Sequence, residues 1–526
     1  MKDSALRCFS RLEECNTLKS LCLERIVFLY THPRKRRQTP SSCQSKPRPE
    51  NPFASLPGNL VADLVETSVR LSPKARDNMT PDVRQEDLEL LVSSGRLRRF
   101  SLWDVEMHSK EFSGVLKKLS QHSSALKEIE IDGVYVRGKR PESIFRSFKT
   151  INQLLRSSPQ LQVLRLGVSG DSLMELLGLN KLEHLSLSFD CRQSLDDVLH
   201  HAALTGRDLC PRLRCFEYND YFSTPSTATV AHILQNCPYL VELKADCSAA
   251  LVQFHQKQFL TEGHVTQRYR LRKAVLGSCV YGQCDGSAFT SSPSPLCAQI
   301  LVETCPNLVD LELYIDSHDT LICLAELSHL QFLKLMWVGT RTVGNFDIST
   351  LSLLHEIGCQ LSELCLHSFT GVDLDAIASI CPSLEALGLI QCRTVCNHIP
   401  ESEPFTKITR LRIIPPTEYP SIQAEADIAC LLASCPSLKS FVVDFVAESF
   451  AVLVERILSA NRFSCLELAG VYFQQPTADL QDGVFRFVTA CKMLKYLVVA
   501  DSDVYDYALE ANPCLKVRYE YLYVGL

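Results

Sequence analysis

Cysteine and histidine are the residues whose spacing in this sequence comes nearest to a chemical site. Cys279 and Cys284 form one group, and Cys392, Cys396 and His398 form a second. A structural zinc site needs paired ligands at C-x-x-C-like spacing, which neither group has. The sequence also lacks the nucleotide-binding, metalloprotease and serine-hydrolase motifs G-x-G-x-x-G, Walker A, H-E-x-x-H and G-x-S-x-G. We therefore predict a protein that is not an enzyme and needs no metal or cofactor.

Composition and charge argue against several classes of function. The chain has 526 residues, of which 46% are hydrophobic and 22% charged, and its formal net charge is −6. These proportions are ordinary for a folded protein, and the negative charge argues against a surface built to bind nucleic acid. No apolar run reaches the length of a membrane span, and charged residues interrupt the first fifteen positions where a secretory signal would lie. We expect a cytoplasmic or nuclear protein with no membrane or nucleic-acid partner.

The 24 cysteines indicate a reduced protein rather than a disulfide framework. Disulfide frameworks are typical of short secreted chains, whereas this chain is long enough to bury a core without cross-links. Several of the cysteines also recur at one place in a sequence repeat described below. We interpret them as reduced, mostly buried, small apolar side chains.

The segment Thr17–Ile26 is predicted to form a helix with one narrow apolar stripe. It has no Gly or Pro, and Leu18, Cys22 and Ile26 are spaced i, i+4 and i+8. The small Cys between two aliphatic residues suits close approach to a partner that has a deep pocket for Leu. Asn16 or Thr17 is well placed to cap the helix N-terminus. The alternative interpretation is a helix that only caps the end of the following domain.

A second short motif predicts the start of another helix. Leu56 and Pro57 are followed by Leu60 and Leu64. Proline suits the first turn of a helix, where its missing N–H costs nothing. Leu60 and Leu64 would then share one helix face.

Residues 31–55 are predicted to be a linker, because five prolines interrupt any periodic pattern and Ser, Gln and Lys fill the intervals. Arg34–Arg37 forms a basic cluster inside it. Two interpretations stay open for this cluster, a nuclear localisation signal or a solvated run of charge, and we favour the second. The predicted organisation is an N-terminal helical region at 1–30, this linker, a helical segment at 56–96 and a repeat array at 97–526.

From residue 97 the chain repeats the leucine-rich-repeat core L-x-x-L-x-L fifteen times. The segment Leu384–Cys392 also matches the longer pattern L-x-x-L-x-L-x-x-N/C at every defined position. The first and last copies start 397 residues apart over fourteen intervals, which gives a period of about 28 residues, inside the range of this repeat class. The copies are Leu97-Phe100-Leu102, Leu126-Ile129-Ile131, Leu161-Leu164-Leu166, Leu182-Leu185-Leu187, Leu213-Phe216-Tyr218, Leu240-Leu243-Ala245, Leu271-Ala274-Leu276, Leu308-Leu311-Leu313, Leu330-Leu333-Leu335, Leu361-Leu364-Leu366, Leu384-Leu387-Leu389, Ile408-Leu411-Ile413, Leu438-Phe441-Val443, Phe463-Leu466-Leu468 and Leu494-Leu497-Val499.

The repeat predicts an α/β solenoid, a horseshoe with parallel strands on the concave face and helices outside. Between the cores we expect helices, for example at 226–236, 296–304, 374–380 and 428–434. Each of these runs into Cys-Pro-x-Leu, where Pro stops the helix and Leu opens the next strand. Residues 248–300 are predicted to be one degenerate repeat with a loop that leaves the array, and 515–521 a final, more polar strand.

The array lacks catalytic groups, so we predict that it is a binding surface. Its concave face would be lined by the x positions of each core. In the middle repeats these include Glu312, Lys334, Glu363, Glu385 and Arg412, which give a lining of mixed charge. This lining does not identify the ligand.

The two N-terminal motifs together resemble a von Hippel–Lindau box. Thr17, Leu18, Cys22 and Ile26 match a BC box, the elongin C-binding helix, and Leu56, Pro57, Leu60 and Leu64 match a cullin 2 box. The resemblance, which covers residues 17–64 only, implies recruitment of elongin B, elongin C and cullin 2. The repeats are similar to those of zyg-eleven, PRAME-like and F-box receptors. These resemblances imply the substrate-recognition subunit of a cullin–elongin E3 ubiquitin ligase that binds a protein substrate.

Two alternatives stay open. An F-box also often begins with Leu-Pro and an amphipathic helix, and would bind a Skp-type adaptor and cullin 1. Against it, residues 66–86 are polar and contain Pro73 and Pro81, whereas an F-box needs several more packed helices. The other alternative is a leucine-rich-repeat scaffold with no ligase role.

Overall fold

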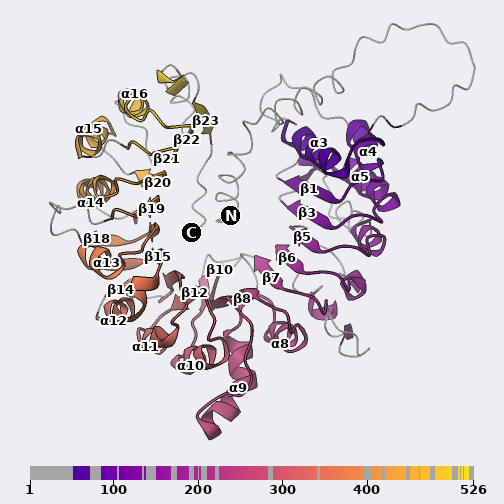
Figure 1. The fold of residues 1–526 in the computed structure, drawn as a ribbon, viewed down its shortest axis with the longest axis horizontal. Coiled ribbons are helices and arrows are strands. Elements are labelled where there is room, and N and C mark those ends of the chain that lie inside the picture. The colour runs from indigo at the N-terminus through magenta and orange to yellow at the C-terminus, as the bar shows by residue number, and fades with distance from the viewer. Residues whose placement is uncertain are drawn as a thin grey trace, which may run out of the picture. The chain divides into compact units, whose positions relative to one another are not determined.

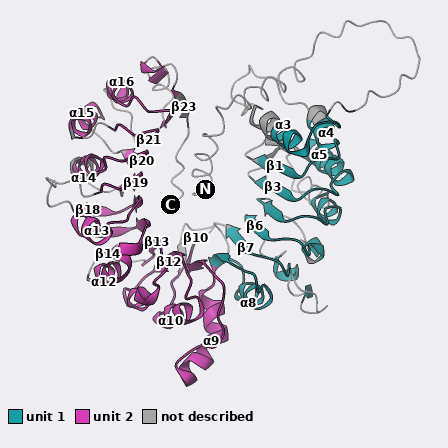
Figure 2. Ribbon diagram, viewed as in Figure 1, with its two compact units in different colours: residues 1–245, 280–287 teal, residues 246–279, 288–526 magenta. Residues whose placement is uncertain are grey.

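The computed structural model forms two compact units, each described by itself (Figure 2). Unit 1 holds residues 1–245 and 280–287, and unit 2 holds residues 246–279 and 288–526. The residues that the structure describes are 51, 53–71, 85–103, 106–132, 135–137, 150–167, 174–188, 195–198, 201–202, 210–219, 224–281, 288–339, 344–346, 348–395, 405–416, 421–445, 450–460, 463–473, 480–499, 508–509, 511–512 and 515–519.

Unit 1 is built on parallel strands that follow one another in the sheet in chain order. These strands are β1 (Arg99–Trp103), β3 (Glu128–Asp132), β5 (Val163–Leu166), β6 (His184–Ser188), β7 (Cys215–Asn219) and β8 (Glu242–Asp246). Helices lie on one side of them (Figure 1). The helical segments include α3 (Gly58–Leu71), α4 (Gln85–Val92), α5 (Ser109–Gln121), η1 (Met174–Gly178) and α8 (Thr227–Asn236). A separate parallel pair is formed by β2 (Glu106–His108) and β4 (Tyr135–Arg137).

Unit 2 repeats the same arrangement, again with parallel strands in chain order and helices on one side of them (Figure 1). Its main strands are β9 (Lys273–Leu276), β12 (Asp310–Ile315), β13 (Phe332–Trp337), β15 (Glu363–His367), β17 (Ala386–Ile390), β19 (Arg410–Ile414), β20 (Ser440–Phe445), β21 (Leu468–Phe473), β22 (Tyr496–Val499) and β23 (Lys516–Tyr519). The helical segments include α9 (Ser248–Glu262), α10 (Pro295–Thr304), α11 (Asp319–Ile322), η2 (Cys323–Glu326), α12 (Ile348–Ile357), η3 (Gly358–Gln360), α13 (Leu374–Ile380), α14 (Ser421–Ala433), α15 (Phe450–Ala460) and α16 (Leu480–Ala490). The short strands are β10 (Ser278–Tyr281), β11 (Ala288–Ser291) and a three-stranded sheet of β14 (Gly344–Asn345), β16 (Phe369–Asp373) and β18 (Arg393–Val395).

The same turn leads into most of the strands, and Cys305 illustrates it. Its backbone N–H closes α10 on the Leu301 carbonyl, and its own carbonyl then accepts from the Leu308 N–H at 3.2 Å. The next two N–H groups donate to one carbonyl of the preceding repeat, that of Arg272. Proline after Cys305 costs no hydrogen bond here, because the helix has already ended. The predicted Cys-Pro-x-Leu signal therefore sets both the end of a helix and the start of a strand.

The core of each unit lies between its strands and its helices. In β12 the residues Leu311, Leu313 and Ile315 are buried, whereas Asp310, Glu312 and Tyr314 on the opposite face are partly exposed. This alternation is what a strand with one covered face requires. Each unit is thus an array of leucine-rich repeats with one strand a repeat, which confirms the predicted α/β repeat fold.

One predicted core has the wrong register. We expected Phe463-Leu466-Leu468, but β21 pairs with β20 so that Ala469 lies opposite Phe441 and Val471 opposite Val443. The core of this repeat is therefore Leu466-Ala469-Val471, shifted by three residues. Phe463 occupies the turn position that Cys holds elsewhere, with its carbonyl accepting from the Leu466 N–H. The small Ala469 hid the true core, because a large residue stands at this position in most other copies.

In the irregular segment 248–300 the structure describes a repeat unit and short strands, whereas residues 282–287 lie outside the described residues. Its first part is the helix α9, which ends at Gly263 in the left-handed conformation, and it is followed by β9. Gly277 also has a positive φ of 81°, and a Cβ there would lie 2.4 Å from the Ser291 carbonyl oxygen. Only glycine meets both conditions at Gly277, so Gly263 serves a helix end and Gly277 a close backbone approach.

Cysteines at the turn position are buried and free, as predicted. Cys210, Cys237, Cys305, Cys435 and Cys491 each have at most 3% of their surface exposed. Burial raises the pKa of the Cys305 and Cys491 thiols to about 12. These thiols therefore stay protonated and act as small apolar groups.

Candidate functional site

The candidate site is the helix-free face of each sheet, which we define as the face opposite the helices. Strand pairing places one residue of each repeat, the x between the last two L positions, in a continuous row that we call the central column. In unit 1 the central column is Ser101, Glu130, Arg165, Ser186, Glu217 and Lys244. In unit 2 it is Val275, Glu312, Lys334, Cys365, Gly388, Arg412, Val442, Gly470, Val498 and Arg518.

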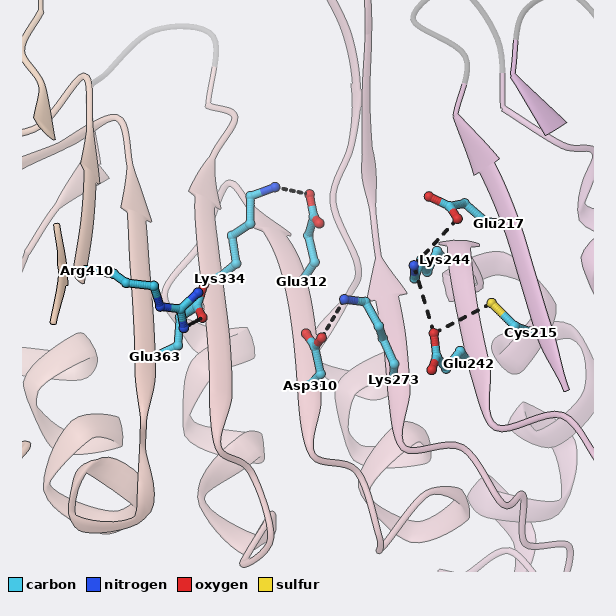
Figure 3. Close-up of polar contacts among 10 residues, drawn as sticks. All are labelled: Cys215, Glu217, Glu242, Lys244, Lys273, Asp310, Glu312, Lys334, Glu363 and Arg410. Atoms are coloured by element: carbon cyan, nitrogen blue, oxygen red, sulfur yellow. Dashed lines mark hydrogen bonds and ion pairs between the residues drawn. The ribbon is translucent and has the colours of Figure 1, made fainter. Parts of the chain in front are cut away.

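In unit 1, opposite charges stand on neighbouring strands of the helix-free face. Arg165 Nη1 lies 2.6 Å from Glu130 Oε1, and Glu130 is 5% exposed. Lys244 Nζ lies 3.5 Å from Glu217 Oε2 and 3.9 Å from Glu242 Oε2 (Figure 3). Sequence reasoning missed the Arg165–Glu130 and Lys244–Glu217 pairs, because the members of each lie on different repeats and only the strand register brings them together.

In unit 2 the same pattern includes three of the predicted residues. Lys334 Nζ lies 2.5 Å from Glu312 Oε1, and the neighbouring pair Lys273–Asp310 has the same separation (Figure 3). Glu363 accepts from Arg410 at 2.9 Å, across the intervening strand β17. Partly exposed ion pairs of this kind contribute about 0–1 kcal/mol each. Each pair neutralises its two charges on this face within the molecule.

The other two predicted lining residues differ from these. Glu385 is exposed and precedes β17, and its backbone carbonyl, rather than its side chain, accepts from the Thr409 and Arg410 N–H groups. Arg412 is half-buried in the central column, between Gly388 and Val442 on the neighbouring strands. The predicted mixed-charge lining is present, but its members are not equivalent.

Part of the predicted adaptor-binding region can be located. Thr17, Leu18, Cys22 and Ile26 lie outside the described residues. Pro57 is exposed directly before α3, and its carbonyl accepts from the Val61 N–H at 3.1 Å. A Cβ on Gly58 would lie 2.0 Å from the Arg96 carbonyl oxygen, so the helix starts tightly against the first repeat.

The leucines of this segment divide into two kinds. Leu56 and Leu60 are half-buried, whereas Leu64 is 1% exposed. The helix α3 packs against α4 and β1, so Leu64 belongs to the core of unit 1. Leu56, Pro57 and Leu60 remain the members of the predicted cullin-binding set that have accessible surface.

The cysteine groups singled out from the sequence gain no support as metal ligands. Cys392 is buried, and its thiol donates to the Leu366 carbonyl at 3.3 Å and the Ile390 carbonyl at 3.4 Å. Cys284, Cys396 and His398 lie outside the described residues. Within the described ranges, no three His, Cys, Asp or Glu side chains are grouped to hold a metal ion.

Among the described helices, none has the length and apolar character needed to cross a membrane.

Comparisons with known proteins find similar solved structures but no related sequence. No family model matches the chain, and no curated protein matches its sequence. The crystal structure of a complex of Rad7 and Elc1 in yeast has 13% identity and a TM-score of 0.41, covering 99% of this chain and 96% of that chain. The leucine-rich-repeat protein LIC12759 of Leptospira interrogans has 12% identity and a TM-score of 0.26, covering 86% and 98%. A TLR13–ssRNA13 complex has 12% identity and a TM-score of 0.28, covering 79% and 72%. All three TM-scores are below 0.5, so our assignment of the fold rests on the strand register described above.

Proposed function

We propose that this protein is the non-catalytic substrate-recognition subunit of a cullin–elongin B/C E3 ubiquitin ligase. The N-terminal motifs would recruit the ligase, with Leu18, Cys22 and Ile26 on elongin C and Leu56, Pro57 and Leu60 on cullin 2. The leucine-rich repeats would hold a protein substrate. The complex would act by proximity, because holding a substrate lysine near a ubiquitin-loaded enzyme raises its effective concentration.

The observation that carries this proposal is the environment of the cullin 2 box motif. Three of its four residues keep accessible surface at the start of α3, whereas Leu64 secures the helix to the first repeat. A docking segment needs both properties, because it must be held rigidly and still present apolar surface to a partner. The order of the two motifs in the sequence supports the same assignment.

The Skp-type alternative gains one supporting observation. We expected residues 66–86 to be polar and broken by Pro73 and Pro81; α3 ends at Leu71, α4 begins at Gln85, and both prolines lie between them, outside the described residues. The two helices pack against each other. An F-box needs packed helices after its Leu-Pro start, so a Skp-type adaptor and cullin 1 remain the second candidate partners.

Binding to purified adaptors separates these candidates. We expect the full chain to retain elongin B/C in a pull-down, and Leu18→Ala/Cys22→Ala to weaken that binding about tenfold or more, since burying a Leu side chain is worth about 1.5–3 kcal/mol. Ser20→Ala/Glu24→Ala, in the same segment but on the helix side opposite the apolar stripe, is the matched control and should bind as the wild type does. Failure of the wild type to bind elongin B/C would overturn the proposal. Binding to a Skp-type adaptor would then favour the second candidate.

A further inference from the structure

Arg412 differs from the other central-column cations whose side chains the structure describes, because no carboxylate of the described residues lies within ion-pair distance of it. Arg165, Lys244 and Lys334 each lie in ion-pair distance of a carboxylate on the adjacent strand. Among the central-column cations whose side chains the structure describes, Arg412 alone has no such carboxylate within the described residues. Its Nε atom is buried and has no hydrogen-bond partner.

Strand register explains why Arg412 is left unpaired. Its register neighbours are Gly388 on β17 and Val442 on β20, and the next strands place Cys365 and Gly470 in the same row. None of these four residues carries a charge that could pair with a guanidinium. On strands β15 to β21 the flanking rows contain two acidic residues: Glu363, which is paired with Arg410 at 2.9 Å, and the buried Asp444 on the adjacent strand β20, which forms no ion pair with Arg412.

The environment of Arg412 makes an unpaired charge costly. A guanidinium stays charged at all physiological pH values, and burial without a partner penalises it. Burial lowers the pKa of Arg412 in this structure, which is the expected sign for a desolvated cation. A position that costs stability in the free protein is a candidate for a ligand contact.

The side chains beside Arg412 are small and weakly polar. A Cβ on Gly388 would lie 2.9 Å from Cys365 Sγ, so the Cys365 side chain occupies the space beside this glycine. On the other side, a Cβ on Gly470 would lie 3.1 Å from a methyl group of Val442. Cys365 and Val442 are both partly exposed. Arg412 is therefore the one charged residue among small or apolar neighbours in its own row, with the buried Asp444 and Tyr472 in one flanking row and the Arg410–Glu363 pair in the other.

We propose that Arg412 binds the carboxylate of an Asp or Glu side chain in an extended segment of the bound protein, with apolar residues of that segment packing on Val442 and Cys365. Charge complementarity carries the assignment, because a guanidinium can donate two parallel hydrogen bonds to the two oxygens of one carboxylate. A phosphate group carries up to two negative charges and would call for a second free cation, but the neighbouring Arg410 is paired with Glu363. The inference rests on the proposed function only in assuming that the repeats bind a protein.

Synthetic peptides test this proposal on the full chain without any adaptor. The probes are acetylated and amidated nonapeptides with a central Glu and with Val, Leu or Phe varied around it, each matched by a peptide with a central Gln. We expect at least one Glu peptide to bind about tenfold or more tightly than its Gln counterpart. Arg412→Gln should abolish this difference. Arg410→Gln, which alters the paired arginine on the same face of the same strand, should retain it.

Three results would overturn the proposal. These are equal binding of Glu and Gln peptides, a Glu preference that survives Arg412→Gln, and an equal loss in both variants. A further arm uses the Gln peptides with free C-terminal carboxylates. If Arg412-dependent binding occurs only with these peptides, the group that Arg412 binds is a C-terminal carboxylate. That result would overturn the assignment to an Asp or Glu side chain.

Thermal unfolding separates a binding role from a structural one. Arg412→Gln removes an unpaired, half-buried charge, so its melting temperature should equal or exceed that of the wild type. Leu411→Ala, at the buried neighbouring position, gives the size of a structural loss. A decrease after Arg412→Gln as large as that after Leu411→Ala would assign Arg412 to the fold. The peptide test contains no elongin, so its result does not depend on adaptor binding. If it fails, the adaptor pull-down still tests the proposed function independently.

Discussion

At the scale of single residues, cysteine in this protein is a packing residue. The Cys237 thiol donates to the Cys210 carbonyl, and the Cys210 thiol donates to the Leu176 carbonyl. Consecutive repeats therefore contact each other through the same small side chain. A larger residue would separate the turns, and a hydroxyl would introduce a more polar group among the leucines.

Thiol alkylation should follow this division between buried and exposed cysteines. Under native conditions at pH about 8, we expect iodoacetamide to modify the exposed Cys359 and Cys465 first. Cys305 and Cys491 should react at least about a hundredfold more slowly, because they are inaccessible and burial raises the pKa of each to about 12. Peptide mapping by mass spectrometry measures this, with the denatured chain as the control in which all four react. Native reaction of Cys305 as fast as Cys465 would contradict the buried turn.

At the scale of elements, α3 has two roles. Val61, Leu64 and Val65 are buried, each with at most 1% of its surface exposed, and the helix packs against α4 and β1. Its preceding residues Leu56 and Pro57 keep accessible surface. The buried face fixes the position of the segment that we propose as a docking site.

Truncation of Leu64 should therefore destabilise the fold. We expect Leu64→Ala to lower the free energy of unfolding by about 2–5 kcal/mol, since a buried leucine leaves a cavity. Asn59→Ala, at an exposed position of the same helix, should change it by about 0.5 kcal/mol or less. Chemical denaturation of both variants measures the difference. Equal stability of the two variants would place Leu64 outside the core and return it to the proposed cullin-binding surface.

At the scale of the whole molecule, each unit is a row of repeats that contact mainly their neighbours. Stability in such arrays is approximately a sum of repeat and nearest-neighbour contributions. The leucine core runs from strand to strand in each unit, and the ion pairs of the helix-free face bridge between strands. The sheet should therefore be the most protected part of each unit, and helix ends that project from it the least.

Hydrogen exchange tests this expectation in unit 2. Strand β13 is paired on both sides, by β12 and β15, so its amides should exchange about tenfold or more slowly than those at the end of α9. Most side chains of residues 256–262 in α9 are exposed, and Gly263 ends the helix. Mass spectrometry of peptides from both elements gives the comparison. Equal exchange rates in β13 and at the end of α9 would contradict this expectation. They would mean that contacts other than those among the described residues protect the end of α9.

The sequence by itself determined the repeat, most of the core and several element boundaries. Helix α13 spans Leu374–Ile380, as the pattern predicted, and fourteen of the fifteen cores have the predicted register. Sequence reasoning succeeded here because inward leucines and helix-ending Cys-Pro signals are local patterns that recur at a nearly constant interval. It failed at Leu466-Ala469-Val471, where a small residue weakened the pattern and a better match lay three residues earlier.

Only the tertiary structure decided which charges on the helix-free face are neutralised. Glu312 and Lys334 are 22 residues apart in the chain, and Glu363 and Arg410 are 47 apart. Such pairs depend on strand register and on the length of each connection, neither of which is encoded in the charged residues themselves. The same register leaves Arg412 beside Gly388 and Val442, without a partner. A sequence pattern predicted that Arg412 lines a face, whereas the arrangement of the strands distinguishes it from the paired cations and led us to propose a binding role for it.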